Sequence, residues 1–416
     1  MRLHGPWQFE PLVRTVVHPD GHIEELSGPV PEPGHMTIPA NWRGTTLDGF
    51  RGRVRWRRNF HSPRSLEPDE RLWIVFEGVD YFADVALNGT PLGRHEGYFE
   101  PFEYEVTSLV GPRNELVVDV DCPAEAVPGE QRLIRGSRDA AESSGAGIWQ
   151  DVALEVRSLA FLRDVFIQAE VDGSTGKITA SGKVVGEPGV PLGLDLSLDN
   201  EAKVGQKLKA SATGVDFRVE ATIDGAELWW PQNLGTPRTY VVELELHGKA
   251  RTLDAKKRTV GFRRLAFDAI RASAEFNGRR FPVVDFDLDA LRGAHGFVQN
   301  DAKKWDEVLQ RLSQGTDCLV VARTAGDVLA PMAYDAADVQ GMLLQQDFPL
   351  GGGYSTELAF RAEATRQAGT FVRQLAHHPS IASWSCHSNP SPHDRELDDS
   401  VRAAITQLDT GRICQM

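Results

Sequence analysis

The stretch DVALNGTPLG, from Asp84 to Gly93, decides the fold of the first part of the chain. Its Asn-Gly pair separates two strand-like runs, which is the strongest short-range signal for a tight β-hairpin. Upstream, RLWIVFEGV (71–79) is a continuous apolar run, typical of a strand covered on both faces. Downstream, NELVVDVDCP (114–123) alternates apolar and polar residues. These runs, separated by recurrent turn clusters, predict an all-β sandwich over residues 1–158.

A second set of alternating runs follows over residues 159–268. VPLGLDLSLDN (190–200) places four leucines on one face, and YVVELELHG (240–248) does the same with valine and leucine. The length and the number of strands suit a small immunoglobulin-like sandwich, although the Cys…Trp…Cys frame of antibody domains is absent. We therefore expect a second β-sandwich here.

The apolar period changes after residue 269. DAKKWDEVLQRLSQG (301–315), a short segment from Pro331 to Val339, a long segment from Thr356 to Ala376, and DRELDDSVRAAITQL (394–408) have helical character. Strand-like runs alternate with them: DCLVVA (317–322), GMLLQQ (341–346), IASWSC (381–386) and RICQM (412–416). This alternation predicts parallel strands in about four β/α units, which is a partial (β/α)8 barrel over residues 269–416. A closed barrel takes about 250 residues.

Composition excludes several classes of protein. The net charge is −14, and the densest basic stretch, RGRVRWRRNF (51–60), alternates as one solvated face of a strand does. We therefore expect no nucleic-acid partner. No run of 18 apolar residues occurs, so we expect no membrane span. The N-terminus has no apolar signal segment, and the four cysteines are scattered, so we expect buried thiols and a cytoplasmic protein.

Several stretches together resemble glycoside hydrolase family 2, the β-galactosidase, β-glucuronidase and β-mannosidase family. The first half contributes residues 78–110 and SSGAGIWQDVALEV (143–156), and the middle contributes LWWPQNLGTPRTYVVELEL (228–246), RTVGFRRLAFD (258–268) and FNGRRF (276–281). LLQQDFPL (343–350) and HHPSIASW (377–384) are nearest the β-mannosidase branch. The resemblance implies a jelly-roll-like, sugar-binding-type sandwich, an immunoglobulin-like sandwich and a catalytic barrel, here degenerate and truncated.

The resemblance also implies a reaction whose catalytic residues we expect this chain to lack. The family hydrolyses β-glycosides with retention, which needs two carboxyl groups about 5–5.5 Å apart. The family's proton donor is a glutamate after an asparagine, at the end of the fourth barrel strand. In IASWSCHSNP that position falls at Asn389, or at Pro390 if Asn389 is the family asparagine. The family's nucleophile comes from a later strand, so we expect no catalytic residue.

Two acidic residues beyond the fourth strand are possible substitutes for the donor. Asp394 and Glu396 follow that strand within SPHDRELDD. Acidic residues also favour the first turn of a helix, where they interact with the helix dipole. The second interpretation is therefore that both residues open a helix.

Five residues make up the expected substrate-binding set. Asp347 matches the family in QQDFP, and its alternative role is a structural carboxylate that caps a loop. Trp149 lies in a glycine-rich loop and could be an exposed stacking platform, and Trp384 would floor the barrel pocket in the family geometry. His387 and Asn389 complete the set.

We expect no metal and no cofactor. His377, His378, His387 and His393 form a loose cluster without the fixed ligand spacing of a zinc site. His377 and His378 precede Pro379 at a helix end, where histidine commonly meets the last carbonyl groups. LGGGYS (350–355) lacks the Lys-Ser/Thr of a phosphate loop.

Three functions are compatible with these features. The first is a catalytically silent family 2 relative that binds a glycan or serves as an assembly scaffold. The second is an active retaining β-glycosidase, of β-mannosidase or β-galactosidase type, completed by a second chain or a further segment. The third is a structural protein. Because the edge strands of a half-barrel are open, we expect a homo-oligomer or a partner protein to cover that edge.

Overall fold

The computed structural model describes residues 1–416 except 19, 21, 43, 125–131, 136–145, 200–201, 250, 269–271, 289–316, 352–353, 389–393 and 416. The chain forms two compact units. The first contains Met1–Arg157, Pro349–Gln367 and His387–Asp398, and the second contains Ser158–Phe348, Ala368–Cys386 and Asp399–Met416. The expected domain ranges 1–158, 159–268 and 269–416 stay predictions.

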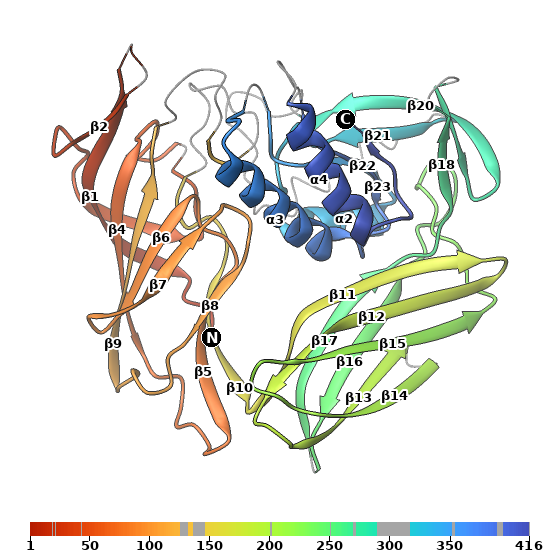
Figure 1. The fold of residues 1–416 in the computed structure, drawn as a ribbon, viewed down its shortest axis with the longest axis horizontal. Coiled ribbons are helices and arrows are strands. Elements are labelled where there is room, and N and C mark those ends of the chain that lie inside the picture. Colours follow the sequence, from red (N-terminus) through yellow and green to blue (C-terminus); the bar gives the residue numbers. More distant parts are fainter. Residues whose placement is uncertain are drawn as a thin grey trace. The chain divides into compact units, whose positions relative to one another are not determined.

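The first unit contains the N-terminal β-sandwich (Figure 1). One sheet has the strand order β2-β1-β4-β9-β6-β7, with β3 also paired to β1, and the other has the order β10-β5-β8. The strands are β1 Gly5–Val17, β2 Ile23–Leu26, β3 Gly34–Ile38, β4 Gly52–His61, β5 Glu70–Phe76, β6 Phe82–Leu87, β7 Thr90–Glu96, β8 Phe102–Glu105, β9 Arg113–Cys122 and β10 Val152–Ser158.

The predicted Asn-Gly hairpin joins β6 to β7. Asn88 and Gly89 adopt positive φ angles of 52° and 81°, as a two-residue turn between antiparallel strands requires. The side chain of Asn88 also accepts a hydrogen bond from the backbone N–H of Glu115 at 2.9 Å, which ties the turn to β9. Leu116, Val118 and Val120 of β9 are buried on one face, as their spacing predicts.

The basic stretch on β4 is a solvated face, as predicted. Val54 and Trp56 are fully buried, and Arg53, Arg55 and Arg57, which alternate with them, point the other way. These arginines pair with acidic residues of neighbouring strands: Arg53 with Asp121, Arg55 with Asp119 and Arg57 with Glu10. The positive charge of this stretch is therefore neutralised locally.

The second unit begins with another two-sheet sandwich. Its sheets have the orders β11-β12-β15 and β14-β13-β16-β17. Leu194, Leu196 and Leu198 of β13 are fully buried and lie opposite Leu246, Leu244 and Val242 of β16. The strands are β11 Ala160–Asp172, β12 Thr175–Gly186, β13 Pro191–Leu198, β14 Ala202–Lys209, β15 Val215–Asp224, β16 Tyr240–His247 and β17 Thr252–Val260. The predicted sandwich is confirmed, and its immunoglobulin-like character stays a prediction.

A curled sheet of the order β18-β19-β20-β21-β22-β23-β24 completes the chain. The first three strands pair antiparallel, and β20 to β24 pair parallel. The strands are β18 Leu265–Asp268, β19 Ser273–Phe276, β20 Arg279–Asp287, β21 Leu319–Arg323, β22 Leu343–Asp347, β23 Ile381–Ser385 and β24 Cys414–Gln415. The predicted half-barrel is confirmed.

Three described helices follow β21, β22 and β23 along the chain (Figure 1): α2 Pro331–Gln340, α3 Leu358–Leu375 and α4 Arg395–Leu408. Their bounds lie within two residues of the predicted segments, because apolar spacing and the flanking Gly341 and Pro379 mark the ends. The predicted helix over 301–315 lies outside the described residues. Within the described part of the chain, no helix is long and apolar enough to cross a membrane.

Candidate functional site

The carboxyl ends of the parallel strands are the first place to look for a site in a barrel-like fold, because loops there converge on one face. β22 ends at Asp347, which is fully buried. Residues alternate between the two faces of a strand, so Gln345 and Asp347 share one face and Gln346 lies on the other. The short contact from Gln345 Nε2 to Asp347 Oδ1, at 3.1 Å, fits this arrangement.

The opposite face of β22 packs on a helix. Gln346 accepts a hydrogen bond from the hydroxyl of Tyr334 in α2 at 2.6 Å. Its amide donates to Thr324 Oγ1 at 3.0 Å and to the backbone oxygen of Asp327 at 2.9 Å. Gln346 therefore marks the helix side of the sheet, and Asp347 belongs to the concave inner face.

Polar side chains surround Asp347 on the inner face. Arg323 of β21 pairs in register with Gln345, and Gln345 pairs with Ser383 of β23. Ser385 lies beside Asp347 in the next position. Ser383 Oγ is buried and has no hydrogen-bond partner among the described residues. We call Arg323, Gln345, Asp347, Ser383 and Ser385 the inner-face cluster.

The carboxylate of Asp347 is held in an unfavourable environment. Burial raises its pKa, and this effect outweighs the hydrogen bond from Gln345, the charge of Arg323 and the backbone amides of Gly326 and Ala325, which lower it. These amides lie in the loop after β21, and the loop-capping role of Asp347 stays a prediction. Oδ2 is buried without a partner of hydrogen-bond geometry in the described residues. One acceptor at the carboxyl end of the sheet thus remains available to a ligand.

Trp384 does not floor an inner pocket, contrary to expectation. It pairs in register with Gln346, so strand alternation turns its side chain toward the helix side. Its ring packs edge-on against Phe371 of α3 at 5.5 Å between centroids, and Nε1 donates to Asp409 Oδ2 at 2.9 Å. Trp384 is a fully buried part of the packing between strand and helices.

Trp149 is not an exposed platform either. It is 4% exposed, and its Nε1 donates to the backbone oxygen of Tyr98 at 2.6 Å. Its ring also lies over Gly78, where an added Cβ would come within 3.1 Å of the indole. Gly78, which lies outside the glycine-rich loop that suggested exposure, provides space for the indole within the first unit.

The other expected site residues lie in the first unit or outside the described residues. His387 is buried, and its Nε2 lies 3.6 Å from Asp398 Oδ2. Its ring also lies 6.4 Å from that of Tyr354. Asn389, Pro390 and His393 lie outside the described residues, so their expected roles stay predictions.

Asp394 and Glu396 open a helix, as the second interpretation of the sequence held. The backbone N–H groups of Glu396 and Leu397 donate to Asp394 Oδ1 at 3.0 and 3.3 Å, which makes Asp394 the cap of α4. Glu396 is exposed and forms an ion pair with Arg361. Neither contact suggests a proton donor.

The histidine pair after α3 divides between two partners. His377 meets the backbone of Gln374 in the last helical turn, as predicted for a helix end. His378 Nδ1 instead lies 2.6 Å from Asp338 Oδ2 in α2. Among the described residues, two groups have ligand atoms close enough for a metal ion: Asp335 with Asp338 and His378, and His18 with His22 and Glu24.

The expected site set lacks four members of the inner-face cluster: Arg323, Gln345, Ser383 and Ser385. The alternation of side chains along a strand could have indicated them, because residues separated by an even number of positions on one strand share a face.

Two family models match the chain. "Glycosyl hydrolases family 2" matches residues 160–263. "Glycosyl hydrolase 2 galactose-binding domain-like" matches residues 51–142. These ranges lie in the middle sandwich and the N-terminal sandwich, in the order that the sequence predicted.

Curated relatives include β-mannosidase B of Thermothelomyces thermophilus, 26% identical over 374 residues, which cover 80% of this chain and 43% of the relative. β-Mannosidase B of Aspergillus oryzae is 24% identical over 419 residues, which cover 91% of this chain and 48% of the relative. The chain thus spans less than half the length of these relatives.

Solved structures share the fold along most or all of the chain. A β-D-mannosidase from Dictyoglomus thermophilum matches with a TM-score of 0.76 and 17% identity, covering 100% of this chain and 57% of the other. A β-glucuronidase from Bacteroides uniformis matches with a TM-score of 0.75 and 18% identity, covering 92% and 48%. The matched models cover residues 51–142 and 160–263, and the relatives are named β-mannosidases, so this chain is similar to glycoside hydrolase family 2, near its β-mannosidase branch.

Proposed function

We propose that this chain binds a glycan at the inner-face cluster and does not hydrolyse it. The observation that carries the proposal is Asp347 Oδ2, a buried carboxylate oxygen without a hydrogen-bond partner among the described residues. A buried acceptor left unpaired costs about 1–3 kcal/mol. A sugar hydroxyl is a suitable donor, because an ionised carboxylate can only accept hydrogen bonds.

The chemistry around Asp347 suits a polyhydroxylated ligand. Gln345 and Ser383 can both donate and accept, and Arg323 carries donors with a fixed geometry. Such a mixture of amide, hydroxyl and charged groups orients a sugar in a protein site. The relatives are named β-mannosidases, which supports a β-linked mannoside as the first ligand to try.

The described strands beside Asp347 offer no second carboxyl group at a suitable distance, which argues against hydrolysis. Retention needs two carboxyl groups about 5–5.5 Å apart. Within the described residues, Ser385 of β23 pairs with Asp347, and Arg323 of β21 and Ser383 of β23 pair with the neighbouring Gln345. Asp287 on β20 shares the register of Arg323, but it lies two strands from Asp347, roughly 9–10 Å away across the sheet. The sequence at the family donor position has Asn389 and Pro390.

A binding experiment tests the first part of the proposal. Methyl β-mannoside, β-galactoside and β-glucuronide are titrated into the purified chain and into Asp347→Asn, with the exposed Asp216→Asn of β15 as the matched control. We expect saturable binding of one of these sugars, lost in Asp347→Asn and kept in the control. Equal binding by wild type and Asp347→Asn would place the sugar elsewhere.

A hydrolysis experiment tests the second part. Aryl β-mannosides, β-galactosides and β-glucuronides are offered to the purified chain and to Asn389→Glu. We expect no turnover by the unaltered chain above the buffer rate. Turnover that survives repurification would disprove the loss of catalysis.

An active retaining β-glycosidase is the second candidate. It is favoured by the β-mannosidase relatives, of which this chain matches 43–48% of the length. A second chain, or a further segment of the same protein, would then supply the nucleophile strand beside β24, which pairs with β23 alone among the described strands. Native mass measurement separates the cases: a homo-oligomer or complex with turnover supports this candidate, and an inactive assembly supports a scaffold.

A further inference from the structure

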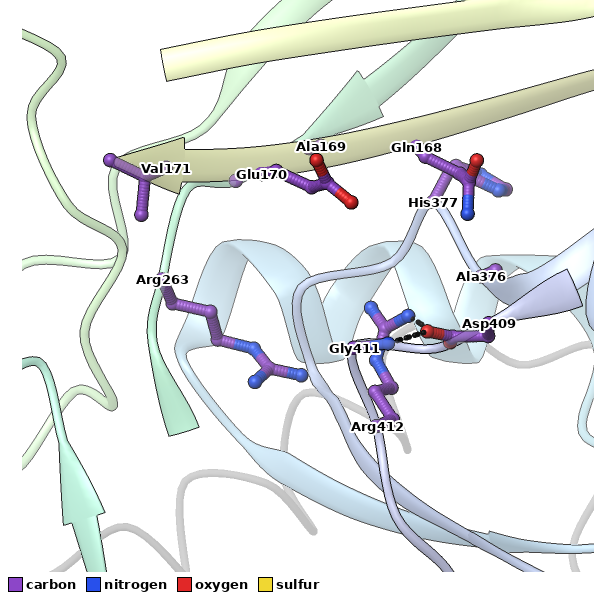
Figure 2. Close-up of a pocket in the computed structure, with 11 residues that line it drawn as sticks. Gln168, Ala169, Glu170, Val171, Arg263, Ala376, His377, Asp409, Gly411 and Arg412 are labelled. Carbon is purple, nitrogen blue, oxygen red and sulfur yellow. Dashed lines mark hydrogen bonds and ion pairs between the residues drawn. The ribbon is translucent and has the colours of Figure 1, made fainter. Parts of the chain in front are cut away.

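A cavity of about 200 Å³ lies in the second unit, between the middle sandwich and the half-barrel (Figure 2). β11 contributes Gln168 and Glu170, and Arg263 comes from the segment after β17. The end of α3 contributes His377, and the segment after α4 contributes Asp409 and Arg412. None of the lining residues belongs to the inner-face cluster, so this is a separate site.

Arg263 is a cation that forms no ion pair within the described residues, although Asp409 and Asp338 act on it at longer range. Its Nε donates to the backbone oxygen of Pro379 at 2.6 Å, and Nη2 donates to that of Ile381. Its side chain forms no ion pair with any acidic residue in the described part of the chain. Burial and the neighbouring charge of Arg412 lower the pKa of Arg263 to about 9. Charges in protein interiors are normally paired, because removing an ion from water is costly.

Asp409 forms its ion pair with Arg412, so its charge does not also balance that of Arg263. Arg412 Nη1 lies 2.5 Å from Asp409 Oδ2, and its other nitrogens donate to the backbone oxygens of Ile381 and His378 at 2.7 and 2.9 Å. Asp409 also accepts from Trp384 Nε1. The Arg412–Asp409 pair is therefore internally neutral, and the positive charge of Arg263 remains.

The remaining polar groups of the cavity can bind an anion without adding charge. Burial lowers the pKa of His377 well below its usual value, and His378, Arg258 and Arg412 lower it further, so its ring is neutral at pH 7. Gln168 donates through Nε2 to the backbone oxygen of Leu408 at 2.9 Å. Figure 2 shows Arg263 and Arg412 extending into the cavity from different segments, with Gln168 and His377 on one side.

Glu170 is an acidic group of the cavity whose cross-strand neighbour, Lys177 of β12, forms its ion pair with Glu220 instead. It is exposed on β11, and it forms no ion pair or side-chain hydrogen bond within the described residues. Its carboxylate lowers the potential that Arg263 creates in the cavity. Removing this charge should strengthen the attraction of an anion without disturbing the packing.

We propose that this cavity binds a small oxyanion, such as inorganic phosphate or a small carboxylate, with Arg263 as the charged donor. The guanidinium edge offers the planar N–H donors that match phosphate and carboxylate oxygens. The bound anion bridges the middle sandwich and the end of the half-barrel helices, and so it stabilises the second unit.

The test measures the binding of inorganic phosphate, sulfate and acetate by isothermal titration calorimetry, against chloride at matched ionic strength. We expect saturable binding of at least one oxyanion to the wild type. Arg263→Gln should weaken it roughly tenfold or more, since a charge-assisted pair is lost. The pattern across the three probes separates a phosphate-type ligand from a carboxylate.

Arg263→Gln removes hydrogen bonds to two backbone carbonyl groups, so this variant could be unstable. Glu170→Gln is a second test that leaves Arg263 in place. Glu170→Gln should bind the oxyanion about threefold to tenfold more tightly at low salt. Glu187→Gln, the same change at an exposed residue of the sandwich outside the cavity, should leave binding unchanged. Asp347→Asn should also leave it unchanged, which separates this site from the proposed glycan site.

The outcomes are decisive in either direction. Oxyanion binding that Glu170→Gln strengthens and Glu187→Gln does not would support the proposal. Absence of saturable binding in both wild type and Glu170→Gln would overturn it. Binding that responds equally to Glu170→Gln and Glu187→Gln would also overturn it, because only the net charge of the protein would then matter.

Discussion

Trp384 Nε1 donates a hydrogen bond to Asp409 Oδ2 at 2.9 Å, across the helix side of the half-barrel. Both residues are buried, and Asp409 also forms the ion pair with Arg412. The contact links the centre of β23 to the segment that leads into β24. It therefore holds the last described strand against the sheet, and it fixes the side chain of the tryptophan away from the inner face.

The first prediction concerns the stability that Asp409 provides. Asp409→Asn should lower the free energy of unfolding by about 3 kcal/mol at pH 7, because a buried ion pair is broken and Arg412 loses its carboxylate. Asp399→Asn, the same change on the exposed face of α4, is the control and should have little effect. Urea unfolding midpoints of the three proteins provide the measurement.

The pH dependence of this effect has a definite sign. Burial would raise the pKa of Asp409, but Arg412 and the hydrogen bonds from Arg412, Trp384 and Gly411 together lower it. A folded-state pKa below the unfolded value gives stability above the unfolded pKa, and this stability is lost as pH falls through the folded pKa. The difference between wild type and Asp409→Asn should therefore shrink in acid. A difference that stays constant down to pH 3 would contradict this prediction.

The second prediction concerns Asp347, whose pKa is raised on folding, so that its effect on stability changes with pH in the opposite direction to that of Asp409. Because burial raises its folded-state pKa, its contribution to stability is present below the unfolded pKa and is lost as pH rises through the folded pKa. Asp347→Asn should therefore gain stability relative to wild type at pH 7.5, and this gain should fade toward pH 4. Thermal unfolding at both values measures it. A variant that is equally less stable at both would show that the loop-capping contacts dominate.

The local periods of the sequence were sufficient to predict the sheets and helices, but the side-chain environments were not. Alternation located the buried face of β9 and the β13–β16 pairs, because a strand buries every second residue whatever its neighbours are. The bounds of α2 and α4 follow from apolar spacing and from stop signals such as Gly341. Local chemistry was enough for these elements.

The predictions for individual site residues were wrong where the surroundings of the side chain come from distant segments of the chain. Trp149 is covered by Tyr98 and Gly78, about 50 and 70 positions earlier, which no local pattern reveals. Trp384 was assigned to the inner face from the family resemblance, although its register with Gln346 places it on the helix side. Asp347 was assigned to the right strand end, and its unpaired oxygen could be found only once Gln345 and the loop after β21 were in place.

The third prediction separates a packing role from a stacking role for Trp149. Trp149→Ala should lower the free energy of unfolding by about 3–5 kcal/mol, because a large buried side chain leaves a cavity. The control is Trp73→Ala, whose ring is partly exposed beneath Arg157 and should cost less. Denaturant unfolding gives both values. A folded, equally stable Trp149→Ala variant that has lost glycan binding would restore the stacking role.

The fourth prediction concerns the group formed by Asp335, Asp338 and His378. Asp338 accepts a hydrogen bond from the backbone N–H of Ser380 at 3.0 Å, and its Oδ2 lies within hydrogen-bond distance of His378 Nδ1, at 2.6 Å. These two contacts join α2 to the start of β23. Asp338→Ala should cost about 2–4 kcal/mol, because both buried partners lose their acceptor. Asp335→Ala, one helical turn earlier and exposed, is the matched control and should change stability by about 0.5 kcal/mol or less.

The same pair of variants distinguishes a structural bridge from a metal site. The ligand atoms of the three residues lie within 4.8 Å of one another, so a divalent ion could be shared among them. A structural bridge needs Asp338 and His378 alone, and a chelator should leave the unfolding midpoint unchanged. If Asp335→Ala and chelator treatment both lowered the midpoint, a bound ion would explain the result better, since an ion would use all three ligands.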